Sequence, residues 1–184
     1  MNAQTALLDS LTLDTLTAYT SIEEALKHPE QVIKLELRKK KLKKFPVEIL
    51  QLTNLQYLDL SKNTIKELPA EIGQLKNLQY LAISKSDLQE IVPQIGELKN
   101  LYHLNLNQNE LSSLPMEIGK LEKLRSLDLW SNNIDNFPDE MKEMKSLKVL
   151  DLRVILIPDA EQYRLQYMLP HTKIYFSPYC KCQQ

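Results

Sequence analysis

A repeat of 23 residues constrains this chain more than any other feature. The stretch LQYLDLSKNTIKELPAEIGQLKN, residues 55–77, is followed directly by LQYLAISKSDLQEIVPQIGELKN, residues 78–100. Similar units begin at Val32, Leu101 and Leu124, and a degenerate unit begins at Leu147. A fixed period of this length predicts a solenoid, in which each unit packs only on its neighbours.

Each unit follows the pattern LxxLxLxxNxLxxLPxxIxxLxx, and its apolar positions predict the path of the chain. Leucines at positions 4 and 6, such as Leu58 and Leu60, flank an outward residue at position 5, which is the pattern of a strand. Positions 14, 18 and 21 have helical spacing, and the proline after position 14 suits the start of a helical segment. One unit buries about seven apolar side chains, too few to offset the entropy of ordering its backbone, so the units must stack.

Stacking predicts a parallel sheet on one side of the molecule and helical segments on the other. Strands pack about 4.8 Å apart, whereas helices need roughly 10 Å, so the sheet is expected on the concave side. Six strands are expected near residues 34–38, 57–61, 80–84, 103–107, 126–130 and 149–153, and a short seventh near 174–176.

The repeat pattern resembles that of the leucine-rich repeat family over residues 32–157, and its LPxxIxxL half resembles the 23-residue bacterial and Ras-suppressor subclass. The resemblance implies an α/β horseshoe with a concave parallel sheet and short helical or 3-10 segments on the convex face. It also implies a non-enzymatic module that binds proteins or peptides on the concave face. Two departures stand out. Lys40, Ser86 and Ile155 replace the asparagine of the pattern, and the proline of the third unit is displaced to Pro93, where we expect local irregularity.

We expect three parts: an N-terminal arm and cap helix over residues 1–31, the repeats over 32–157, and a C-terminal cap and tail over 158–184. Residues 1–20 have no clean period and are expected to form an irregular arm, with part of it ordered against the first repeat as an open alternative. Ser21 and Glu24 form a capping box that predicts a short helix. Leu16, Ile22 and Leu26 are the candidates for covering the apolar flank of the first repeat.

The C-terminal part combines a predicted helix, a predicted strand and two cysteines. The helix is expected over residues 159–168, between Pro158 and Pro170, and the strand over residues 173–176. Cys180 and Cys182 lack enough neighbouring ligands for a metal site, because His171 alone is insufficient. We expect free or intermolecularly paired thiols there.

The outward strand positions 3, 5 and 7 are expected to carry the ligand site, because stacked strands bring them into rows. Aromatic and arginine side chains anchor interfaces, and the only tryptophan is predicted to lie on this open face. The predicted ligand-binding residues are Tyr57, Asp59, Tyr80, His103, Asn105, Asn107, Asp128, Trp130, Asp151 and Arg153. Two alternatives stay open: an aromatic ladder that only stabilises the sheet, and a carbohydrate-binding surface on which Tyr and Trp stack against sugar rings.

Catalysis and cofactor binding are not expected. His103, Ser126 and Asp128 are predicted to be neighbours on two strands and have the composition of a nucleophilic triad. An exposed sheet excludes little water, and no turn rich in glycine is present to form an oxyanion hole. We therefore predict no enzyme, no cofactor and no metal.

The basic run Arg38–Lys44 allows two interpretations. It is either a patch for phosphate, acidic polysaccharide or nucleic acid, or a series of exposed turn positions in which only Leu42 points inward. The second is favoured, because Leu42 keeps its place in the repeat period.

Composition limits the classes of binding partner but does not determine the cellular compartment. A net charge of −1 argues against a general nucleic-acid binder, and no apolar run approaches the ~20 residues of a membrane span. We expect a monomer with a protein or peptide ligand. The start Met1-Asn2-Ala3-Gln4 fits both a mature secreted or periplasmic protein, because Asn-Ala-Gln resembles the end of a cleavage site, and an ordinary cytoplasmic start.

Overall fold

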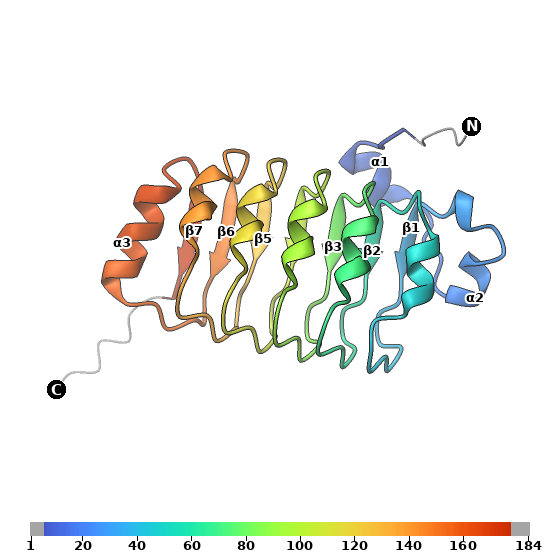
Figure 1. Ribbon diagram of the computed structural model, residues 1–184, viewed down its shortest axis with the longest axis horizontal. Coiled ribbons are helices and arrows are strands. Elements are labelled where there is room, and N and C mark those ends of the chain that lie inside the picture. Colours follow the sequence, from blue (N-terminus) through green and yellow to red (C-terminus); the bar gives the residue numbers. More distant parts are fainter. Residues whose placement is uncertain (1–5, 178–184) are drawn as a thin grey trace.

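The computed structural model describes residues 6–177 and shows one open sheet of seven parallel strands backed by short helices (Figure 1). The strands follow each other in the order of the sequence, as stacking of successive repeats requires. They are β1 Lys34–Glu36, β2 Tyr57–Asp59, β3 Tyr80–Ala82, β4 His103–Asn105, β5 Ser126–Asp128, β6 Val149–Leu152 and β7 Lys173–Phe176.

The predicted strand register is confirmed. Leu58 pairs with Leu81, and Leu81 pairs with Leu104, and all three are fully buried. β1 to β5 are three residues long, shorter than the five expected. Beyond position 5 the chain bends into a turn, where the N–H groups of positions 6 and 8 donate to the carbonyls of positions 5 and 7 of the next unit without counting as strand. The leucines of successive units form the single core of the molecule.

The convex side carries one 3-10 helix for each of the first five units. They are η2 Val47–Gln51, η3 Ala70–Gln74, η4 Pro93–Glu97, η5 Met116–Lys120 and η6 Asp139–Glu143. Proline is the N-cap of four of them, and in the third unit Val92 takes that place with φ −68° and ψ 146°, close to the −69° and 149° of Pro115. The irregularity expected in this unit is therefore absent. Pro93 fits the first helical position, where its missing N–H costs nothing.

Asparagine side chains at position 9 connect successive units. Oδ1 of Asn63 accepts the backbone N–H groups of Lys40 and Leu42 in the unit before it, at 2.9 and 3.1 Å, and its Nδ2 donates to the carbonyls of Leu37 and Leu60. Asn109 repeats this pattern one period from Ser86. In the units with Lys40 and Ser86, the asparagine of the next unit accepts the backbone N–H groups of the turn. The turn therefore tolerates the replacement of asparagine at these two positions.

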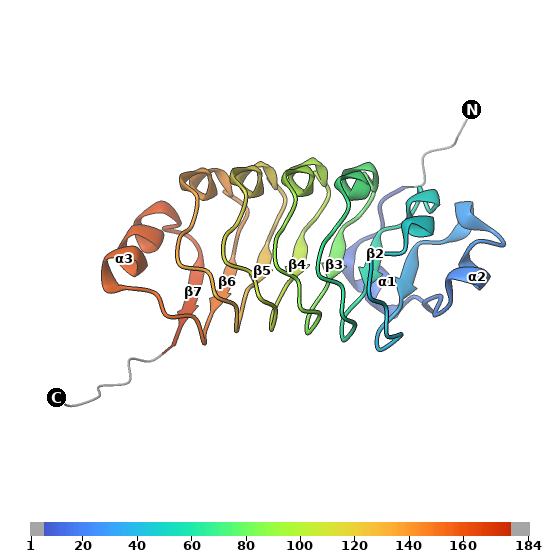
Figure 2. The same ribbon diagram turned by 60° about the horizontal axis from the view of Figure 1, so that its bottom comes forward.

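Glycine lets the convex helices approach one another. A Cβ on Gly119 would lie 2.2 Å from the carbonyl oxygen of Glu140, and one on Gly96 would lie 2.5 Å from that of Glu117. None of the three glycines has a positive φ, so the requirement is for space and not for an unusual backbone. The first unit carries Leu50 at this position, and its helix η2 lies off the row formed by η3 to η6 (Figure 2).

The N-terminal arm is more ordered than expected. Residues Ser10–Thr15 form helix α1, capped by Asp9, whose side chain accepts from the N–H of Thr12. Leu13 of this helix is fully buried, whereas the predicted Leu16 is only partly so. The helix itself was not expected, because a six-residue helix is too short to show periodicity. Tyr19 then bridges in parallel to Leu35 and extends the sheet at its first edge.

The predicted helix is confirmed, and Ser21 caps it: Ser21 accepts from the N–H of Glu24 at the start of α2, Ile22–Ala25, while the Glu24 carboxylate pairs with Lys27. A 3-10 helix, η1 Pro29–Gln31, leads into β1. Ile22 and Leu26 pack against the core as predicted.

The C-terminal cap has the predicted elements. Helix α3 spans Asp159–Met168, and β7 pairs in parallel with β6, bringing Ile174 beside Leu150. Arg164 holds α3 to the fifth unit by pairing with Asp139 and donating to the carbonyl of Phe137. Cys180 and Cys182 lie outside the described residues. Within residues 6–177, no helix combines the length and apolar character that crossing a membrane requires.

The glycine contacts generate a prediction with an internal control. We expect Gly119→Ala to lower the free energy of unfolding by about 1–3 kcal/mol, because the added methyl meets backbone. Gly73→Ala should cost clearly less, since its nearest atoms, at 3.1 Å, include the flexible end of Glu97. Both substitutions change the unfolded chain equally. Urea unfolding of the two variants measures the difference, and equal losses would contradict the steric explanation.

Candidate functional site

The first row of outward side chains on the concave face forms a continuous stack. The Tyr57 and Tyr80 rings lie 4.1 Å apart with planes 3° from parallel, and the Tyr80 and His103 rings lie 4.5 Å apart at 6°. Nζ of Lys34 lies 4.4 Å from the centre of the Tyr57 ring, a cation–π contact that continues the stack. Equal strand register places these side chains side by side, as the sequence predicted.

The N-terminal arm covers the beginning of this face. Lys34 is buried and donates from Nζ to the carbonyls of Leu13 and Asp14 at the end of α1. Gln56 donates to the carbonyl of Ala6 and accepts from the N–H of Leu8, so the arm crosses the second repeat as well. Two predicted ligand-binding residues are closed off: Tyr57, beside Lys34, is 9% exposed, and Asp59, which contacts Arg38 and Ser61, is fully buried.

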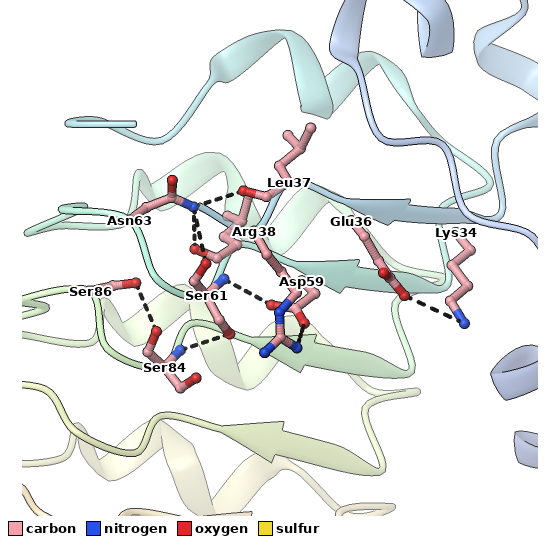
Figure 3. Close-up of polar contacts among 10 residues, drawn as sticks. Lys34, Glu36, Leu37, Arg38, Asp59, Ser61, Asn63, Ser84 and Ser86 are labelled. Carbon is pink, nitrogen blue, oxygen red and sulfur yellow. Dashed lines mark hydrogen bonds and ion pairs between the residues drawn. The ribbon is translucent and has the colours of Figure 1, made fainter. Parts of the chain in front are cut away.

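Asp59 has a structural role instead, visible in Figure 3. One carboxylate oxygen accepts from Arg38 at 2.7 Å, and the other accepts the backbone N–H of Ser61 at 2.8 Å. The hydroxyl oxygen of Ser61 in turn accepts the N–H of Ser84 at 3.1 Å (Figure 3). The network fastens the strand ends of the first three units to one another.

The same use of position 5 recurs along the sheet. Asn105, Asp128 and Asp151 each accept, at 3.1 Å, the backbone N–H two residues ahead, from Asn107, Trp130 and Arg153 respectively. This is an Asx turn that ends the strand. The third unit has Ala82 here, and Ser61 of the unit before it supplies the acceptor. The recurring Asp or Asn in the sequence was the signal for this role, which we had assigned to ligand binding alone.

The open part of the concave face lies over β4 to β7 and is centred on Trp130. On one side Nδ2 of Asn107 donates to Asp128 at 2.6 Å, and on the other Arg153 pairs with Asp151 at 2.5 Å. Trp130 is partly exposed, and its indole N–H donates to no group within residues 6–177. A rigid polar frame therefore surrounds a large ring with a free donor.

Sequence reasoning missed Tyr175, which extends the same surface. It lies beside Asp151 in the register of β6 and β7. The Arg153 guanidinium lies 5.6 Å from its ring centre, and Nζ of Lys173 lies 4.8 Å from it. The predicted seventh strand contained the signal, because its outward residue continues the row of position 5.

No triad forms from His103, Ser126 and Asp128. His103 and Ser126 are register partners, but the Asp128 carboxylate is occupied by the N–H of Trp130 and by Asn107. Within the described chain no hydrogen bond joins the three side chains. Groups of three or more His, Cys, Asp or Glu that could hold a metal ion are also absent from residues 6–177.

Burial shifts the titration of the stacked residues. It raises the pKa of the Tyr80 hydroxyl, and it lowers the pKa of His103 although the carboxylates of Asp128 and Asp14 act in the opposite direction. The neutral imidazole is therefore favoured in the folded protein, which suits stacking on Tyr80.

The lowered pKa of His103 predicts how stability depends on pH. The unfolded chain, with a histidine pKa near 6.5, binds the proton more readily than the folded protein. The contribution of His103 is thus fully present above this pH and is lost as the pH falls below it. We expect His103→Tyr, which keeps a ring in the stack, to flatten the decline in melting temperature between about pH 7 and 5. An unchanged slope in the variant would show that His103 is not the group responsible.

Comparisons with known proteins agree with the geometry. A family model described as a leucine-rich repeat region matches residues 23–101, and another described as a leucine rich repeat matches residues 76–134 and 99–154. No curated protein sequence matches the chain significantly.

Solved structures extend the agreement over most of the chain. A leucine-rich repeat protein of Leptospira interrogans is 36% identical, with a TM-score of 0.77 over 87% of this chain and 40% of its own. Internalin C2 from Listeria monocytogenes (23% identity, TM-score 0.68) matches 82% of this chain and 64% of its own and supports the fold alone. A plant peptide hormone receptor, RGFR1, in complex with RGF2 (27%, 0.66) matches 79% of this chain and 24% of its own. Repeat pattern, strand register and these matches together show that the chain belongs to the leucine-rich repeat family.

Proposed function

We propose that the chain is a non-enzymatic module that binds a protein or peptide on its concave face, over β4 to β7, with Trp130 at the centre. Leucine-rich repeat domains are generally protein-interaction modules, and one structural neighbour is a peptide hormone receptor. The observation that carries the proposal is the partly exposed Trp130 ring within a frame of side chains that are already hydrogen-bonded.

The frame favours binding because it needs little reorganisation. Asn107 and Arg153 are each held by a neighbouring carboxylate, so a ligand would not have to immobilise them. Trp130 buries a large area at a small cost in side-chain entropy, which is why tryptophan is enriched among residues that dominate binding energy. The arm leaves this part of the face open, so we place the ligand here and not over Tyr57.

The same contacts argue for a protein ligand over a carbohydrate. Sugar recognition needs free acceptors for ring hydroxyls beside the stacking aromatic. Both oxygens of the Asp128 carboxylate and both of the Asp151 carboxylate already accept from backbone or side-chain donors, so fewer acceptor sites remain for sugar hydroxyls. The Trp130 ring offers an apolar face and an indole N–H, and these suit the apolar side chains and carbonyls of a polypeptide.

We expect Trp130→Ala to weaken binding by about 2 kcal/mol or more, roughly 30-fold, and to leave the melting temperature nearly unchanged. The probe is a peptide selected from a random displayed library on the full chain and titrated by calorimetry. The matched control is Tyr163→Ala, which removes a 72% exposed ring from α3, outside the concave face. Because Trp130 is the only tryptophan, its fluorescence reports whether the peptide reaches this surface.

Two outcomes would contradict the proposal. A selected peptide that binds with full affinity to Trp130→Ala, without changing tryptophan fluorescence in the parent, would place the ligand elsewhere. A glycan array with specific signals that Trp130→Ala abolishes, in the absence of any selectable peptide, would replace the protein ligand with a carbohydrate.

A further inference from the structure

One edge of the solenoid is formed by the turns that follow the strands, here named the turn edge (Figure 1). Its residues at position 8 are held in a row by backbone hydrogen bonds from each unit to the next. The N–H groups of Lys39, Lys62 and Lys85 donate to the carbonyls of Ser61, Ser84 and Asn107 at 3.2, 2.7 and 3.0 Å. Gln108, Ser131 and Val154 occupy position 8 in the remaining units.

The turn edge is strongly basic at its N-terminal end. Stacking brings Lys62 and Lys85, from separate repeats, beside the basic run of the first unit. Nearby Lys39 and Arg38 lower the pKa of the Lys62 ammonium. At positions 8 to 13 of the first three units, the exposed lysines without an ion pair in the described part of the chain are Lys39, Lys40, Lys41, Lys43, Lys44, Lys62, Lys66 and Lys85. The structure therefore extends the exposed run seen in the sequence into a patch across three repeats.

The turn edge is apolar at its C-terminal end. Positions 8 and 10 of the sixth unit are Val154 and Leu156, which are 60% and 96% exposed. They correspond to Lys39 and Lys41 of the first unit, so the repeat register places both pairs on the same edge.

The backbone at position 8 has a left-handed conformation, which disfavours most residue types other than Gly and Asn. All six residues at this position have a positive φ, between 53° and 61°. Val154, at 59°, is β-branched, for which this conformation is a genuine outlier. Asn or Gly would be less strained and, at an exposed site, more compatible with water. Strain retained together with an exposed aliphatic side chain points to function and not to packing.

We infer that the turn edge binds the surface of a membrane that contains anionic phospholipids. The lysines of the first three units would face the headgroups, and Val154 and Leu156 would enter the interface. Weak electrostatic and weak apolar attachment combine in this way in peripheral membrane proteins.

Distance favours a membrane over a smaller anion. Five repeat steps of about 4.8 Å separate Lys39 from Val154, roughly 24 Å. A single phosphate group cannot reach both ends, whereas an extended surface can. A soluble polyanion could follow the lysines but has no use for two exposed aliphatic side chains. Single-stranded nucleic acid is disfavoured as well, because Phe45, which follows Lys44, is buried and cannot stack on a base.

The test is co-sedimentation of the full chain with vesicles of phosphatidylcholine and phosphatidylglycerol, roughly 3:1, and with vesicles of phosphatidylcholine alone. We expect binding to the mixed vesicles only, weakened by added salt. The triple variant Lys39→Gln, Lys62→Gln, Lys85→Gln should lower the affinity by about 100-fold, near fivefold for each lysine. The double variant Val154→Asn, Leu156→Ser should lower it at least tenfold, and Val154→Asn should not harm folding because Asn tolerates this backbone.

Each turn-edge variant has a control variant that removes the same number of lysines, or of apolar side chains, from another part of the surface. The charge control is Lys142→Gln, Lys145→Gln, Lys148→Gln, three exposed lysines in and after η6, away from the turn edge. The apolar control is Val47→Asn, Met116→Ser, two residues that are each 59% exposed on convex helices. Both controls should bind vesicles as the parent does, and melting curves confirm that every variant is folded.

Retained binding by the controls, with loss in both turn-edge variants, supports the inference. No binding of the parent to the mixed vesicles would overturn it. Loss in the lysine variant but not in the Val154 and Leu156 variant would also overturn it, because a soluble polyanion would then account for the patch. Equal loss in the charge control would show an attraction without a defined surface.

Discussion

The in-register parallel ladder between successive units is the constraint on which the rest of this structure depends. It places each side chain beside the residue one period away, on both faces of the sheet. Inside, Leu58, Leu81 and Leu104 pack on one another, and outside, Tyr57, Tyr80 and His103 stack. Side chains of the same kind therefore lie beside one another in rows. Rows of apolar or aromatic side chains attract, whereas rows of equal charge repel.

Polar side chains in these rows find partners at a different position of the unit before them. A carboxylate at position 5 reaches the turn of its own unit and position 7 of the unit before it, as Asp59 does with Ser61 and Arg38 and as Asp128 does with Trp130 and Asn107. Position 8 has no such partner row, so Lys39, Lys62 and Lys85 remain unpaired neighbours. Their mutual repulsion is moderate because they project into water, where charge interactions are weak.

The sequence was sufficient for the register, because period and alternation act within each unit and identical units have one way to stack. It was insufficient where order arises from contacts between unlike segments. No pattern in residues 6–15 predicts that Gln56 binds the arm or that Lys34 binds the end of α1. Those contacts decide which predicted site residues stay open, since they bury Tyr57 and leave Trp130 accessible. The displaced Pro93 led to a wrong prediction of local irregularity for the opposite reason. Stacking on the neighbouring units determines the backbone of the third unit, and this outweighs the shift of one proline.

The concave face and the turn edge meet along the ends of the strands, which has a consequence for how the two proposed surfaces relate. Trp130 at position 7 and Ser131 at position 8 are consecutive, yet they belong to different surfaces because the chain turns between them through a left-handed residue. A membrane along the turn edge would contact position 8 and leave positions 3 to 7 facing sideways into solvent. A ligand could then reach Trp130 while the protein is held at a surface, and neither partner would need to displace the other.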